Sequence, residues 1–203
     1  MDPKNRVLTL WTSQTKPVLD ALERDGVCYN KECYIRRKYG EVADVFLTAY
    51  RAYYRNASEL LPPPPEAESA YWAFADPRDM FLGDDQTALK LEVPADQVIL
   101  FDVFDWNRIL QFRYLGETEE ENRAFERELE RRGITGYDVL HSNFYPDLRA
   151  RILGSWKRLL RHHEALLSGD RTGVRAVQAG LWQLRREWIC PPEGEKTGAA
   201  GPV

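Results

Sequence analysis

The sequence predicts an α+β fold: one domain over residues 1–190, with a small mixed or antiparallel sheet packed with helices. Two observations predict it. Runs with the alternation of β-strands lie in the first half of the chain, and apolar residues at helical spacing lie towards both ends. The length of 203 residues suits one domain, and the 43% hydrophobic content supplies a core. Residues 191–203, rich in Gly, Pro and Ala, are expected to form a disordered tail.

The chain opens with a predicted strand at residues 6–12, followed by a helix. Thr15 is placed to be the N-cap of this helix, and Gly26 suits the position after its last turn. A second helix is expected at about residues 40–56, and the four prolines of residues 62–65 end it. We interpret these prolines as a rigid connector rather than an SH3-type ligand, because their flanks lack a basic specificity residue.

The middle of the chain predicts strands and the remainder predicts helices, so the C-terminal third is expected to be helical. The predicted strands are residues 71–74, 88–93 and 98–101. The predicted helices are residues 106–114, 118–132, 146–167 and 172–189, with Asp105, Thr118 and Thr172 as N-caps and Glu121 completing a capping box.

The net charge of -4 combines two segments of opposite sign. Residues 117–132 carry seven acids and four arginines, whereas residues 149–186 carry nine basic residues and two acids. Apolar residues at 3-4 spacing leave the basic side chains of the second segment largely on the other face. That face is either a solvated polar surface or a surface for an anion or nucleic acid, with Arg151, Arg158 and Arg161 as candidate contacts. The low net charge argues against a uniformly basic nucleic-acid binder.

Few residues have the spacing of a catalytic or metal centre. The glycine-rich phosphate loops and the G-x-S-x-G motif are absent. The adjacent His162 and His163 would diverge on a helix, so no metal site is predicted. Asp102 and Asp105 directly follow a predicted strand, where two carboxylates can do acid–base work or hold a metal. Capping of the following helix explains the pair as well.

The compartment follows from the cysteines and the N-terminus. Cys28, Cys33 and Cys190 are an odd number without paired spacing, which favours reduced thiols. No apolar leader follows Met1, and no apolar run is long enough to cross a bilayer. We therefore expect a cytoplasmic protein that does not bind membranes.

Several short motifs, in a fixed order, resemble those of an uncharacterised bacterial family whose members open with a Leu-Trp-Thr-x-Gln strand. Each motif is weak alone, and their order carries the resemblance over most of the chain. The motifs are Leu10–Gln14, Tyr71–Phe74, Leu91–Pro94, Val98–Asp102, Ser155–Leu159 and Gln178–Trp182.

The same layout is similar to DarT-type ADP-ribosyltransferases, which modify DNA bases with NAD. The resemblance assigns Thr12 to the strand that contacts NAD and residues 74–78 to an aromatic strand that leads into a Pro-Arg loop. It assigns Gln178 and Ala179 to the segment that carries the catalytic acid.

Two positions depart from the DarT pattern. Trp11 stands in the neighbourhood where those enzymes have a ring-polar residue, and Gly180 stands where the acid is expected. Transfer without that carboxylate should be severely slowed. Either Glu187 or Asp102 replaces it, or the protein binds a nucleotide without turning it over.

We therefore expect an ADP-ribosyltransferase-like protein that binds NAD as a substrate and modifies nucleic acid or protein, as a toxin or defence enzyme. The alternative is a non-catalytic module that binds nucleic acid or protein through the basic segment 149–186. The candidate catalytic residues are Asp102, Gln178 and Gln183. The candidate NAD-binding residues are Trp11, Thr12, Gln14, Tyr34, Arg36, Arg37, Tyr71, Trp72 and Trp182.

Overall fold

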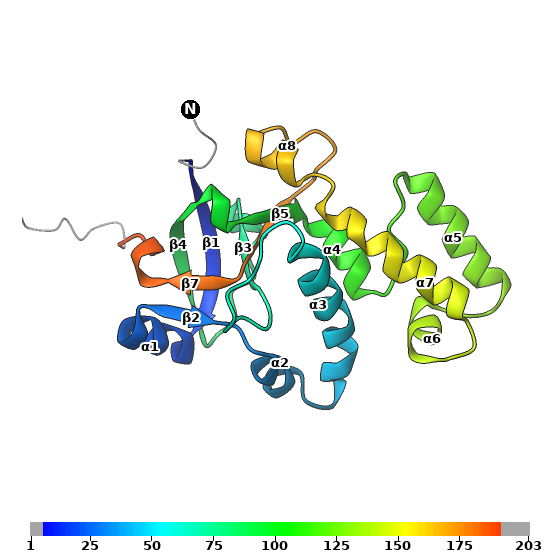
Figure 1. Cartoon of the computed structure of the whole chain (residues 1–203), viewed down its shortest axis with the longest axis horizontal. Helices are drawn as coiled ribbons and strands as arrows, with labels where there is room; N and C mark the ends of the chain where they lie inside the picture. The colour runs from blue at the N-terminus through cyan, green and yellow to red at the C-terminus, as the bar shows by residue number, and fades with distance from the viewer. Residues whose placement is uncertain (1–5, 192–203) are drawn as a thin grey trace, which may run out of the picture.

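The computed structural model describes residues 6–191 and places a five-stranded sheet, a two-stranded sheet and a set of helices in one α+β fold (Figure 1). The strands are β1 (Val7–Thr15), β2 (Val27–Tyr29), β3 (Tyr71–Phe74), β4 (Gln86–Pro94), β5 (Ile99–Asp102), β6 (Val177–Leu181) and β7 (Gln183–Arg185). The helices are α1 (Lys16–Asp25), α2 (Glu32–Tyr39), α3 (Ala43–Ala57), α4 (Val103–Leu110), α5 (Glu119–Arg131), α6 (Gly136–His141), α7 (Pro146–Ser155) and α8 (His163–Ser168).

The structure confirms the predicted N-terminal strand, the helix that follows it, and the glycine after the last turn of that helix. β1 runs directly into α1 at Thr15, whose extended backbone makes it the N-cap residue, although its side chain makes no capping bond. Gly26 has φ 75°, in the left-handed region that glycine adopts without strain, and its N–H donates to the Leu22 carbonyl. The helix predicted at residues 40–56 is α3, while α2 was not predicted.

The main sheet is antiparallel, in the order β4-β1-β3-β6-β5. β3 has its predicted bounds, and β4 and β5 differ from prediction by a few residues at their ends. β1 pairs with β4 along its whole length. Within the described chain, however, β1 pairs with β3 at Trp11 and Phe74 alone. These two neighbouring strands therefore separate beyond that pair.

The helix predicted at residues 172–189 is wrong, because this segment forms β6 and β7. β6 lies between β3 and β5, and all five of its residues are buried. A strand buried on both faces shows no polar alternation, so its apolar residues could also satisfy a helical spacing. The long helix predicted at residues 146–167 is also divided, into α7, a 3₁₀ turn at Trp156–Leu160, and α8.

Three N-caps in the second half were predicted, and two of them are corrected. Thr172 caps no helix, because the helix predicted at residues 172–189 does not form. Thr118 caps α5 as expected, because its side-chain oxygen accepts from the Glu121 N–H. The cap of α4 is Asp102, which accepts from the Phe104 N–H at 3.0 Å, and not Asp105, which lies inside the first turn. The predicted tail falls outside the described residues from residue 192 onward.

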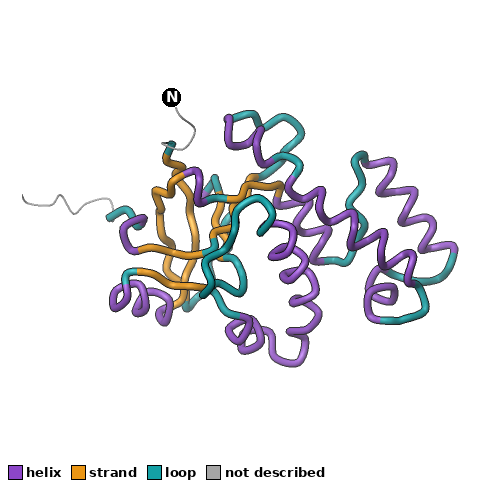
Figure 2. The backbone as a smooth tube through the Cα atoms, in the orientation of Figure 1, coloured by secondary structure: helices purple, strands orange, loops and turns teal. Residues whose placement is uncertain are grey.

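The two faces of the sheet carry two separate cores. The Trp72 face holds Trp72, Phe101 and Gly180 and is covered by α3 and α4. The Tyr71 face holds Tyr71, Ala73 and Ala179 and is covered by α1, α8 and the β2–β7 sheet. Figure 2 shows the strands gathered at one end of the molecule.

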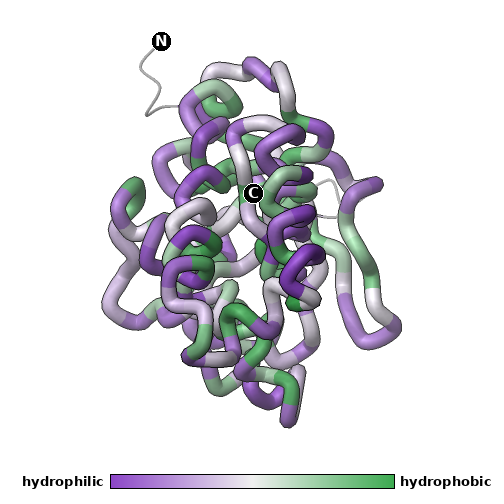
Figure 3. The backbone as a smooth tube through the Cα atoms, turned by 90° about the vertical axis from the view of Figure 1, so that its right-hand side faces the viewer, coloured by the Kyte–Doolittle hydropathy of each residue, from purple (hydrophilic) through white to green (hydrophobic). Residues whose placement is uncertain are grey.

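Helices α5–α7 form the other end of the molecule, and Figure 3 turns that end towards the viewer, with hydrophilic and hydrophobic residues interleaved along it. Among the described residues, none of the helices is long and apolar enough to cross a membrane.

Candidate functional site

The predicted NAD-binding residues fall on opposite faces of the sheet, because successive side chains of a strand point to opposite sides. Trp11 is paired with Phe74, and Phe74 with Gln178, so these three side chains share the Trp72 face. Thr12 and Tyr71 lie on the other face. The structure therefore does not bring the predicted residues together in one site.

One part of the predicted set does converge, in a region that we call the strand split. It is defined by Thr12 and Gln14 of β1, Tyr71 of β3 and Cys28 of β2. Gln14 Nε2 donates to Thr12 Oγ1 at 2.7 Å, and Thr12 Oγ1 donates to the Trp72 carbonyl at 2.7 Å. Thr12 and Gln14 are both buried. Their side chains thus link β1 to β3 where the backbones no longer pair.

Tyr71 lies on the far side of the strand split. Its hydroxyl is 3.0 Å from Cys28 Sγ. Burial raises the pKa of Tyr71, and the neighbouring Cys28 and Tyr34 raise it further. The phenol is therefore neutral at physiological pH and remains a hydrogen-bond donor. Tyr34 is 52% exposed on α2, so the strand split lies within electrostatic reach of an exposed aromatic residue.

The arginines predicted to contact phosphate also lie on α2. Arg36 and Arg37 are exposed, and Arg36 Nη1 is 2.9 Å from Asp44 Oδ1 of α3. Their helix carries Tyr34 as well, which places three of the predicted residues on one short element. Three of the predicted NAD-binding residues therefore lie at the strand split (Thr12, Gln14 and Tyr71), and three lie on α2 (Tyr34, Arg36 and Arg37). Of the α2 residues, Tyr34 is close enough to Tyr71 to raise its pKa.

The two tryptophans Trp72 and Trp182 belong to the core instead. Both pack around Tyr53 of α3, with ring centroids 4.9 Å and 5.9 Å from its ring. Trp182 is buried, and its Nε1 donates to the Leu61 carbonyl at 2.7 Å. Their rings therefore pack with other aromatic rings of the core, on the face of the sheet opposite Tyr71.

Position 180 has no room for a side chain. A Cβ at Gly180 would lie 1.9 Å from the Tyr53 hydroxyl oxygen and 2.8 Å from Tyr53 Cζ. The acid that the DarT resemblance expects at this position therefore could not be accommodated beside Tyr53. Gln178, two residues earlier on the same face, is buried, and its Oε1 has no hydrogen-bond partner among the described residues.

The other candidate catalytic residues hold the structure together. Asp102 is buried, and its Oδ2 accepts from the Arg175 N–H at 3.3 Å in addition to the α4 cap. Gln183 pairs with Tyr29, which places it on the opposite side of the small sheet from Cys28. Glu187 is exposed and lies 3.6 Å from Arg185. The structure gathers none of these three side chains at the strand split.

Asp105 is a carboxylate near β5 whose pKa is shifted by its surroundings. Burial raises its pKa, and the neighbouring Asp102 adds to this, while Arg161 opposes it. Arg161 Nη2 lies 2.9 Å from Asp105 Oδ2. Among the described residues, no three His, Cys, Asp or Glu side chains lie close enough together to hold a metal ion.

The acidic and basic segments face each other. Arg151 pairs with Glu128 at 2.9 Å, and Arg158 Nε is 2.5 Å from Glu117 Oε1. With Arg161 bound to Asp105, all three predicted anion contacts already oppose carboxylates. Carboxylates therefore balance part of the positive charge of the predicted basic face at these three positions.

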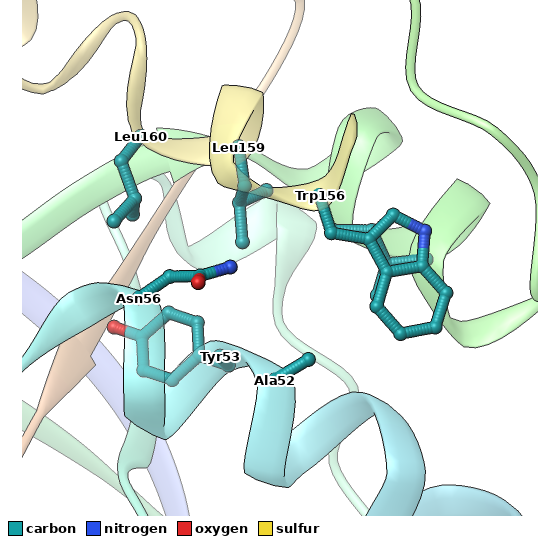
Figure 4. Close-up of a pocket in the computed structure, with 7 residues that line it drawn as sticks. Ala52, Tyr53, Asn56, Trp156, Leu159 and Leu160 are labelled. Atoms are coloured by element: carbon teal, nitrogen blue, oxygen red, sulfur yellow. The ribbon is translucent and has the colours of Figure 1, made fainter. Parts of the chain in front are cut away.

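A crevice beside α3 is lined by Tyr53, Asn56 and Trp156 with Ala52, Ile109, Leu159 and Leu160, and it is too tight for a water molecule (Figure 4). The Asn56 amide points into it from α3. Asn56 Oδ1 has no hydrogen-bond partner within the described part of the chain. The crevice is a packing defect of the core and offers no volume to a ligand.

Sequence reasoning missed Cys28 and Tyr53. Cys28 lies in a three-residue strand, which is too short to show periodicity. Tyr53 was recognised only as one of the apolar residues of a helix. Its role over Gly180 depends on a contact between elements more than a hundred residues apart, which a single sequence does not display.

These features define a class: an α+β protein in which two neighbouring interior strands of the sheet separate at a largely buried polar cluster. The chain belongs to the family described as "Domain of unknown function (DUF3841)", whose model matches residues 9–190. Neither the curated proteins nor the solved structures gave a match.

Proposed function

We propose that the protein binds NAD at the strand split, as an ADP-ribosyltransferase-like protein. The observation that carries the proposal is the group of polar side chains Thr12, Gln14 and Tyr71 at the strand split, with the exposed Tyr34 of α2 nearby and Arg37 exposed on the same helix. Hydroxyl and amide groups suit the amide and ribose of NAD, while arginine suits its phosphates. The resemblance of the Leu10–Gln14 strand to the NAD-contacting strand of DarT-type enzymes supports the same site.

The chemistry of the site favours binding over rapid turnover. Transfer breaks the bond between nicotinamide and its ribose and joins that ribose carbon to an acceptor, whose proton a base removes. None of Thr12, Gln14, Cys28 and Tyr71 is a carboxylate that could serve as the base, and position 180 has no room for an acid. We therefore expect NAD to bind and nicotinamide to be released slowly relative to binding.

Calorimetric titration with NAD tests the binding, and a matched pair of variants tests its place. Tyr71→Phe removes the hydroxyl at the strand split, whereas Tyr53→Phe removes a buried hydroxyl on the opposite face of the sheet. We expect Tyr71→Phe to weaken NAD binding about tenfold, which corresponds to the loss of one hydrogen bond. Tyr53→Phe should leave the affinity unchanged.

Two outcomes would overturn the proposal. One is the absence of NAD binding by folded wild-type protein at concentrations of about 1 mM. The other is an equal loss of affinity in Tyr71→Phe and Tyr53→Phe, because a site at the strand split requires them to differ. Release of labelled nicotinamide, measured separately, reports turnover without affecting the binding result.

A further inference from the structure

β5 forms one edge of the main sheet, and a histidine side chain lies against that edge. The strand order ends at β5, which pairs with β6 on its inner side. In an antiparallel pair every second residue points its N–H away from the partner strand, so a buried edge needs another acceptor. For Leu100 that acceptor is His163 Nδ1 of α8, at 3.1 Å. The imidazole ring therefore takes the place of a carbonyl group of a sixth strand.

The hydrogen bond between Leu100 and His163 lies inside the protein. His163 is 8% exposed and Leu100 is 4% exposed. Leu166, the other buried residue of α8, belongs to the same core as Leu100. A buried N–H that loses its acceptor destabilises the structure around it. The hydrogen bond and the packing of α8 against β5 therefore depend on each other.

Protonation of His163 is incompatible with this hydrogen bond. Neutral imidazole has one acceptor nitrogen, whereas both nitrogens of the protonated ring are donors. Because Nδ1 accepts from Leu100, the proton of the neutral ring lies on Nε2, and a second proton would bind to Nδ1. That proton would face the Leu100 N–H, and two donors repel each other. The ring must therefore leave the edge of β5 when it is protonated.

Charged groups on the same segment as His163 act on its ring. Burial lowers the pKa of His163 below 6.5, and Glu164, the next residue of α8, opposes this in part. On the preceding turn, Arg161 Nε donates to His162 Nε2 at 3.1 Å, which places a positive charge on that side. His163 is also the first residue of α8, where the helix dipole disfavours a positive charge. The surroundings therefore favour the neutral ring while α8 is in place.

The elements packed around α8 also carry charged groups. Asp102 of β5 accepts hydrogen bonds from the backbone N–H groups of Phe104 and Arg175, so its carboxylate already has two donors. Arg6, which precedes β1, donates from Nη1 to the Leu167 carbonyl at 2.6 Å, near the other end of α8. The residues that β6 contributes to this core are apolar: Val177, Ala179 and Leu181.

α8 is short enough to detach while the sheet remains folded. It has six residues, and it lies between the 3₁₀ turn at Trp156–Leu160 and Gly169, whose φ is 95°. A helix of this length is not stable without its tertiary contacts. Segments with few buried residues open locally at a lower cost than the whole protein. The loss of the His163 hydrogen bond therefore acts on a segment that is held by few contacts.

We propose that His163 is an acid-sensitive latch, whose protonation releases α8 from the edge of β5 while the strands of the main sheet stay paired. The release exposes the Leu100 N–H at the end of the sheet, where an extended strand can pair with it. The latch opens progressively as the pH falls below 6.5, because an exposed histidine binds a proton in that range. It closes again when the ring loses its proton.

Amide hydrogen exchange of the whole protein, followed residue by residue with NMR, tests the latch. Between pH 7.5 and pH 5.5 the protection factors of the Leu100 and Leu166 N–H groups should fall together by about tenfold, because proton binding by an exposed histidine shifts the opening by this factor. Low concentrations of urea should not change them, since the release of α8 exposes little surface. Phe101, which pairs with Gln178 of β6, should stay better protected and should respond to urea.

Two variants separate the latch from other effects of pH. His163→Asn retains an acceptor oxygen but binds no proton, so the protection of Leu100 should no longer fall tenfold. His141→Asn replaces an exposed histidine and should behave like the wild type. A fall that persists in His163→Asn would reject the latch.

The wild type alone also decides the question, so the test does not depend on the folding of a variant. If Leu100 and Phe101 have the same protection factor and the same urea dependence at pH 5.5, α8 opens only when the whole protein unfolds. That result would overturn the proposal. An unchanged protection factor of Leu100 between pH 7.5 and pH 5.5 would overturn it as well.

Discussion

At the scale of single residues, Gly180 and Tyr53 form a pair in which one residue has no side chain because the other fills its space. We expect Gly180→Ala to lower the free energy of unfolding by about 1–3 kcal/mol, the usual cost of an added group in a packed core. Tyr53→Phe removes a buried hydroxyl that has no partner in the described chain, so we expect stability to rise by up to about 1 kcal/mol.

Urea denaturation of both single variants and of the double variant measures this coupling. Since the two atoms share one space, the double variant should lose less stability than Gly180→Ala alone. Additive effects, or a Gly180→Ala variant as stable as the wild type, would show that the contact is not close.

His163 makes the stability of the fold depend on pH. Its Nδ1 accepts from the Leu100 N–H at 3.1 Å, and burial lowers its pKa below 6.5. As the pH falls below 6.5, His163 becomes protonated in the unfolded chain but stays deprotonated in the folded protein. The free energy of unfolding therefore decreases. The loss continues until the pH reaches the folded-state pKa.

Urea midpoints at pH 7.5 and pH 5.5 check this dependence. His163→Asn retains an acceptor oxygen but does not bind a proton, and we expect a smaller decrease than in the wild type. His141→Asn is the matched control, because His141 is exposed. If His163→Asn and His141→Asn show the same decrease, the pH effect has another origin.

At the scale of elements, the arginines of the α7–α8 region differ in importance according to burial. Arg161→Ala would leave the buried Asp105 without its guanidinium, which should cost about 3 kcal/mol. Arg151→Ala breaks a pair whose arginine side chain is 49% exposed, which should cost about 0.5 kcal/mol. Denaturation at pH 7 compares the two variants, and equal losses would contradict this ranking. Adding Asp105→Asn to Arg161→Ala should recover part of the loss.

Elements with local signals could be predicted from the sequence. The β1–α1 unit has its own start and stop at Thr15 and Gly26, and β3 has its predicted bounds. β6 could not be predicted, because burial on both faces removes the polar alternation by which a strand is recognised. The secondary structure of such an element depends on strands that are distant in the sequence, so the local sequence pattern predicts it wrongly.

The candidate site was predicted in part. The strand at residues 71–74 was predicted, and its alternation puts the side chains of Tyr71 and Trp72 on opposite faces of the sheet. The predicted site also included both Trp11 and Thr12. Their side chains point to opposite faces of the sheet, because side chains alternate along β1 as well. The separation of β1 from β3, which creates the strand split, depends on pairings between strands and is not visible in either strand's sequence.

At the scale of the whole molecule, β6 contacts both cores: Val177, Ala179 and Leu181 belong to the core on the Tyr71 face, and Gly180 lies against Tyr53 and Trp72 on the other face. We expect one cooperative unfolding transition, with coincident curves from circular dichroism and tryptophan fluorescence. Leu22→Ala and Ile152→Ala remove buried side chains from different cores and should each lower stability by about 2–5 kcal/mol. In each variant both curves should shift together. Separate transitions would show that the cores unfold independently.

The position of the late strand β6 between β3 and β5 also affects the order in which the sheet can form during synthesis. During synthesis β4, β1 and β3 leave the ribosome early, but β5 pairs with β6 alone among the described strands. β5 therefore stays without a strand partner until residues 177–181 have emerged. For most of translation the nascent chain exposes the open edges of β3 and β5, the kind of surface that chaperones protect.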